Sequence, residues 1–135
     1  MTSAVSALQA ALAAENAAIY GYGVAGAYLS GSAESAATSD WHAHLVARDT
    51  LQSMITRLGA TPVAAEYGYE LPFTVDDGSS AAKLAAYVED GVTNGYLGVV
   101  AVANESLRSF GARAMLDPAL RAARWRGSTE SFPGF

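Results

Sequence analysis

One carboxylate lies in the middle of an apolar helical stripe near the start of the chain. The other positions of this stripe recur at spacings of three and four residues, as on one face of a helix, and are Val5, Leu8, Leu12, Ile19, Tyr22, Gly26 and Leu29. Glu15 occupies the remaining position. Burying an unpaired charge is very costly, so Glu15 must meet a cation, a metal ion or a proton in the folded chain.

Two further ionisable side chains fall on predicted buried faces and can share a site with Glu15. His44 lies on the stripe predicted for residues 38–58, and Glu89 lies at or near the core face predicted for 80–103. Glu15, His44 and Glu89 offer three oxygen and nitrogen ligands, which can hold Fe, Mn or Zn and leave coordination positions open. One interpretation is therefore a metal-binding or redox protein with a reduced metal site, its cofactor being Fe or Mn.

Arginines provide a second interpretation, in which no metal binds. Arg48 follows His44 by one turn on the same predicted face, and further arginines lie on the last predicted helix. A guanidinium has five N–H donors and matches carboxylates in geometry, so it can take the place of a metal's charge. The sequence then predicts no catalytic residue, but a buried ion network made of Glu15, Arg48, Glu89, Arg121 and Arg124.

A di-metal centre in a four-helix bundle needs more ligands than this chain offers. The usual pattern takes one Glu from each of two helices and a Glu-x-x-His pair from each of the other two. His42 and His44 are the histidines of the chain, and the residue three positions before His44 is Trp41. We therefore predict no di-iron centre and favour the ion network, with a metal site at Glu15, His44 and Glu89 as the alternative.

The elements that must position these residues are four helices. Apolar periodicity and turn residues predict them at about residues 3–30, 38–58, 80–103 and 104–126. The segment 60–79 contains two prolines and is too long for a tight turn, so it predicts a crossover along the length of a bundle. Two antiparallel helical hairpins joined by one long crossover form the ferritin-like pattern among all-α four-helix bundles. A C-terminal tail, 127–135, completes the single predicted domain.

Composition excludes several classes of protein. The formal net charge is −5, which argues against a nucleic-acid-binding surface. There is no cysteine, so disulfides, thiolate metal sites and thiol catalysis are excluded. No apolar stretch has the length and character of a membrane span, and the N-terminus lacks the basic leader of a signal peptide. We therefore expect a cytoplasmic protein that binds neither nucleic acid nor membrane.

Small and aromatic residues on the predicted helices suggest a partner and a further kind of site. Small-residue faces permit close approach of helices, and those expected to pack against a second copy in a homodimer contain Gly21, Gly91, Gly95 and Gly98. A third functional interpretation is a small-ligand pocket between helices, walled by Tyr22, Tyr96 and Trp125 with arginines at its mouth.

Five stretches that together cover most of the chain resemble a known family. They are ALAAENAAIYGYGVAGAYL at 11–29, HAHLVARD at 42–49, GATPVAAEYGYELPF at 59–73, AAYVEDGVTNGY at 85–96 and RAARWRGSTESFPGF at 121–135. In these stretches the chain is similar to a small actinobacterial family of ferritin-like proteins known as a domain of unknown function. The resemblance implies a dimeric ferritin-like four-helix bundle with a degenerate metal site and no established substrate.

The resemblance extends to part of a metal-ligand set. Glu15 and Glu89 match the single-Glu positions on the first and third helices, whereas the positions on the second and fourth helices do not match. This departure argues against ferroxidase or oxygenase activity. With the missing histidines, it favours a structural or interaction protein of unknown biochemical function.

Overall fold

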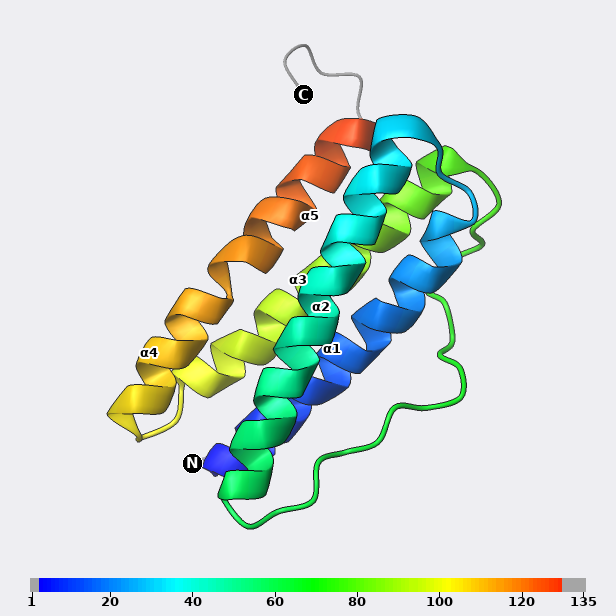
Figure 1. Ribbon diagram of the computed structural model, residues 1–135. Coiled ribbons are helices and arrows are strands. Elements are labelled where there is room, and N and C mark those ends of the chain that lie inside the picture. The colour runs from blue at the N-terminus through cyan, green and yellow to red at the C-terminus, as the bar shows by residue number, and fades with distance from the viewer. Residues whose placement is uncertain (1–2, 130–135) are drawn as a thin grey trace.

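The computed structural model of the chain describes residues 3–129, and within them every regular element is a helix. The helices are α1 (Ala4–Gly26), α2 (Gly31–Arg57), α3 (Gly78–Val100), α4 (Glu105–Ala114) and α5 (Leu116–Thr129). They form a bundle in which α1 runs antiparallel to α2, and α3 runs antiparallel to the α4–α5 pair (Figure 1). The all-α prediction is confirmed. None of these described helices combines the length and the apolar character that a membrane span requires.

A long irregular segment connects α2 to α3. It follows the outside of the bundle from one end to the other (Figure 1), so α2 and α3 start at the same end and run in the same direction. Gln9 on α1 holds the first part of this segment, because its side-chain amide donates to Thr61 O at 2.7 Å. Further along, the ring of Tyr69 packs on Tyr20 of α1, with the ring centroids 5.4 Å apart.

Helix boundaries differ from the sequence-based ones at the first connection. α1 ends at Gly26 rather than near residue 30, and α2 begins at Gly31 rather than near residue 38. Gly31 has a φ of 61°, a left-handed conformation that glycine adopts at little cost, and it lets the chain reverse within residues 27–30. The Ala- and Ser-containing sequence that follows holds no proline and continues as helix from that point.

The last predicted helix is divided in two. Met115 forms the C-cap of α4, and α5 starts immediately after it, next to the Asp117–Pro118 pair that predicts a kink or restart. The proline lies in the first turn of α5, where its missing N–H breaks no helical hydrogen bond. α5 continues to Thr129, so the tail predicted to begin at residue 127 starts as helix. Residues 130–135 lie outside the described part of the chain.

Short-range polar contacts define the other helix ends. Ser3 and Asn104 accept backbone hydrogen bonds at the start of α1 and α4. Asp77 caps α3 and forms a capping box with Ser80, which places this start slightly before the predicted one. At the end of α2, Gly59 has a φ of 84° and its N–H bonds back into the last helical turn, as expected for a glycine just after a helix.

α1 packs closely on α3, and two glycines permit it. A Cβ added to Gly21 would lie 2.8 Å from a methyl carbon of Val88, and one added to Gly95 would lie 3.1 Å from the Ala11 Cα atom. Both glycines therefore serve packing within one copy of the chain, which corrects the expectation that they belong to a dimer face. A Cβ added to Gly91 or Gly98 would meet no atom within 4 Å among the described residues.

This packing gives the first testable prediction. Gly95→Ala should lower the free energy of unfolding by about 1–3 kcal/mol, because the new methyl group meets the backbone of α1 and overpacked sites cost that much. Gly98→Ala on the same helix is the matched control, and the higher helix propensity of alanine should make it neutral or stabilising by up to about 1 kcal/mol. Urea denaturation of both variants measures the difference. Equal effects at the two positions would contradict the assigned α1–α3 contact.

Candidate functional site

The buried face of α2 carries two ionisable side chains. Asp40 and His44 are 5% and 0% exposed, one turn apart on the face that also buries Leu51 and Ile55. Arg48 is not on this face. Its side chain is 33% exposed and pairs with the neighbouring Asp49, so the prediction that it joins a buried network is wrong. Spacings of 40, 44 and 51 and of 41, 44 and 48 both satisfy helical periodicity, and only packing decides which stripe turns inward.

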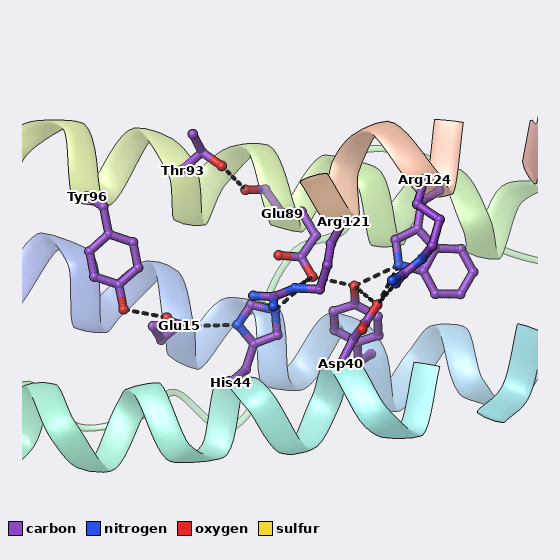
Figure 2. A network of polar contacts seen from close by, with 10 residues as sticks. Glu15, Asp40, His44, Glu89, Thr93, Tyr96, Arg121 and Arg124 are labelled. Carbon is purple, nitrogen blue, oxygen red and sulfur yellow. Dashed lines mark hydrogen bonds and ion pairs between the residues drawn. The ribbon is translucent and has the colours of Figure 1, made fainter. Parts of the chain in front are cut away.

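His44 bridges two buried carboxylates at the centre of the bundle. Its Nδ1 atom faces Glu15 Oε1, and its Nε2 atom lies 2.9 Å from Glu89 Oε2. Figure 2 shows the three side chains in one row, each from a different helix, α1, α2 and α3. Because a carboxylate only accepts hydrogen bonds, both ring nitrogens of His44 must donate, and the imidazole carries a positive charge.

Two tyrosine hydroxyls donate further hydrogen bonds to these carboxylates. Tyr96 donates to Glu15 Oε2 at 2.6 Å, and Tyr22 donates to Glu89 Oε2. Burial, and after it the nearby carboxylate charge, raises the pKa of both phenols above the ordinary tyrosine value, so both stay neutral donors. Glu89 Oε1 is buried and has no hydrogen-bond partner within the described residues.

Two arginines from α5 close the network from the other side. Arg121 donates from Nε to Glu89 Oε2 at 2.9 Å, and Arg124 pairs with Asp40. Trp125 is 2% exposed and donates its indole N–H to Asp40 Oδ2 at 2.9 Å. The network thus contains three carboxylates, two guanidinium groups and one imidazolium, and these charges balance.

The pKa values follow from these contacts. Burial alone would lower the pKa of His44, but its hydrogen bonds to Glu15 and Glu89 outweigh burial and raise it to about 9. Burial would raise the pKa of Glu89, but His44, Arg121 and Tyr22 reverse this effect and lower it. For Arg121, the charge of Glu89 likewise outweighs burial and raises the pKa. At neutral pH His44, Glu89 and Arg121 are therefore ionised, and their charges compensate one another.

The donor set does not fit a di-metal centre. The chain has one buried imidazole, and each of its nitrogens already faces a carboxylate. Arg121 brings a positive charge to Glu89, where a second ligand helix would be expected to bring a carboxylate or imidazole. Within residues 3–129, no three His, Asp or Glu side chains are arranged so that they could share one metal ion.

Sequence reasoning about the site missed Asp40 and misplaced the proposed ligand pocket. Asp40 follows Ser39 in a polar stretch, and nothing in that stretch marks it as buried. Tyr22 and Trp125 are buried in the core and hydrogen-bonded to each other at 2.9 Å, so they do not line a common pocket. Tyr96 instead lines a cavity of about 190 Å³ with Arg121, between α2 and the α4–α5 pair.

Comparison with known proteins identifies relatives of unknown function. A family model described as a domain of unknown function, DUF4439, matches residues 7–135. The structure is similar to the crystal structure of a conserved hypothetical protein from Mycobacterium tuberculosis, with a TM-score of 0.88 and 31% sequence identity over 96% of this chain and 92% of the other. No curated protein matches the chain significantly.

Proposed function

Because the chain belongs to the DUF4439 family of proteins with a domain of unknown function, we propose its function from its own site. The protein is a ferritin-like bundle that acts as a structural or interaction protein and not by di-iron chemistry. The two hairpins and the long crossover support the ferritin-like assignment (Figure 1). The ion network at the bundle centre supports the absence of a di-iron centre. The homodimer and the cytoplasmic location expected from the sequence remain predictions.

One observation carries this proposal. His44 uses both ring nitrogens on Glu15 and Glu89, and Arg121 binds the same oxygen of Glu89. Positive charge on these two side chains replaces the charge that metal ions supply in ferritin-like enzymes. A buried ion network of this kind keeps its geometry only while every partner is present, because removing one leaves an uncompensated charge.

The alternative is a mononuclear metal site at Glu15, His44 and Glu89, which requires these side chains to rearrange, because among the described residues they are not placed to share one ion. One observation favours it, namely that Glu89 Oε1 is buried and unpartnered among the described residues, so a carboxylate oxygen remains open to a cation. Binding would require His44 to give up a proton from one nitrogen and lose one of its two carboxylate contacts, because a ligating imidazole is not doubly protonated.

Metal analysis separates these two functions. Protein purified without a metal-affinity tag, before and after anaerobic incubation with Fe(II), should contain well below one metal per chain. Fe(II), Mn(II) and Zn(II) should each leave the melting temperature unchanged, since a ligand that binds only the folded state would raise it. Stoichiometric metal that is lost in Glu15→Ala but retained in the surface variant Glu66→Gln would overturn the proposal and establish the alternative.

A further inference from the structure

The packing of α2 leaves a seam along one side of the bundle. α2 packs closely on α1, and α5 on α3, whereas α2 makes only sparse contact with α4 or α5. Three neighbouring cavities of about 390, 190 and 370 Å³ follow this seam. The central one shares Thr50 and Phe110 with the first, and Asp117 and Arg121 with the last. We call this central space the seam cavity.

The seam cavity reaches from the surface to the ion network. Glu15 and Tyr96 form its floor, and the small side chains of Ala43 and Ala47 on α2 leave its wall open. At about 190 Å³ it is large enough for a small organic molecule, since a cavity of about 150 Å³ can hold one the size of benzene. Phe110 adds an apolar surface on the side of α4.

Two opposite charges face this cavity without pairing with each other. Asp117 and Arg121 are four residues apart on α5, a spacing that normally favours an ion pair. Arg121 instead turns inward, and its Nε donates to Glu89 (Figure 2). Its terminal nitrogens have no hydrogen-bond partner within residues 3–129, and neither does the Asp117 carboxylate. The cavity therefore presents free N–H donors and a free carboxylate together.

We propose that the seam cavity binds a small zwitterion of the α-amino-acid class, with its carboxylate on the Arg121 guanidinium and its ammonium group on the Asp117 carboxylate. Two terminal guanidinium nitrogens match a carboxylate in bidentate geometry. The apolar lining at Phe110 and the alanines accepts a short apolar side chain. A ligand with only one of the two charges forms only one of the two charge-assisted contacts, to Arg121 or to the exposed Asp117, which sets the specificity.

This inference deepens the proposed function and rests on it in one respect: the floor of the cavity is an ion network and not a metal centre. The two experiments are independent. Metal analysis tests the network, and amino-acid titration of the intact protein tests the cavity, so the failure of one is distinguishable from the failure of the other.

Isothermal titration calorimetry with each of the twenty common amino acids tests the inference. At least one should bind with a Kd of about 1 mM or tighter, a strength within reach of a ligand this small. The amine and the carboxylic acid that lack one charged group of the tightest ligand should each bind at least about tenfold more weakly. Absence of binding by all twenty, or equal binding of a single-charge analogue, would overturn the proposal.

Three variants place the binding in the seam cavity. Ala47→Leu fills it without changing any charge and should weaken binding at least about tenfold, as should Asp117→Asn, which removes a charge-assisted contact. Glu66→Gln removes an equivalent exposed charge from the crossover, outside the lining, and should leave the Kd unchanged. Circular dichroism confirms that each variant is folded. Binding that survives Ala47→Leu, or that falls equally in Glu66→Gln, would contradict the assigned site.

Discussion

His44→Ala should lower the free energy of unfolding by about 3–5 kcal/mol, the cost of leaving a buried charge uncompensated. The imidazolium is fully buried and is the contact that joins Glu15 on α1 to Glu89 on α3. Without it, two carboxylates remain in the core and have lost the cation that lies between them. Urea or thermal denaturation followed by circular dichroism measures the loss.

The chain supplies a matched control for this variant. His42 lies on the same helix and is exposed, so His42→Ala should change stability by no more than about 0.5 kcal/mol. Adding Glu15→Gln to His44→Ala should recover part of the loss, because the amide removes one uncompensated charge and coupled neighbours are not additive. A loss below about 1 kcal/mol in His44→Ala would show that the imidazole does not hold these carboxylates.

Stability should fall as the pH rises from about 6 to 9.5. The pKa of His44 is raised from 6.5 to about 9 in the folded protein, so folding favours the protonated form. Its contribution is complete below the unfolded pKa of 6.5 and is lost as the pH passes through about 9. One pKa unit corresponds to about 1.36 kcal/mol, so the raised pKa represents about 3 kcal/mol at most.

Denaturation at pH 6 and at pH 9.5 tests this dependence. His44→Gln is the control, since an uncharged amide cannot titrate, and its stability should vary much less over the same interval. At the acid end, the lowered pKa of Glu89 predicts the opposite slope, with stability lost as the pH falls below the ordinary range for a carboxyl group. Unchanged wild-type stability between pH 6 and 9.5 would contradict a charged His44.

Sequence periodicity was sufficient for the helical class and for the burial of Glu15, His44 and Glu89, but it missed Asp40 and misplaced Arg48. Glu15 interrupts an apolar stripe, and a long proline-containing segment separates two pairs of helices, so both features follow from local rules. The face of α2 that turns toward the core did not follow from such rules. Trp41 and Arg48 lie at helical spacing from His44, as Asp40 and Leu51 do, and packing on α1 and α5 decides which pair is buried.

The sequence by itself determined that a buried carboxylate needs a cation, and that both histidines fall on one helix, whereas the usual di-metal pattern needs one on each of two helices. Only the tertiary structure decided which cationic side chain pairs with which carboxylate. His44 reaches both glutamates because α1, α2 and α3 meet around it, while Arg121 and Arg124 arrive from α5, far away in sequence. Local spacing carries no information about such distant pairs, because the distances between their atoms are set by how whole helices pack.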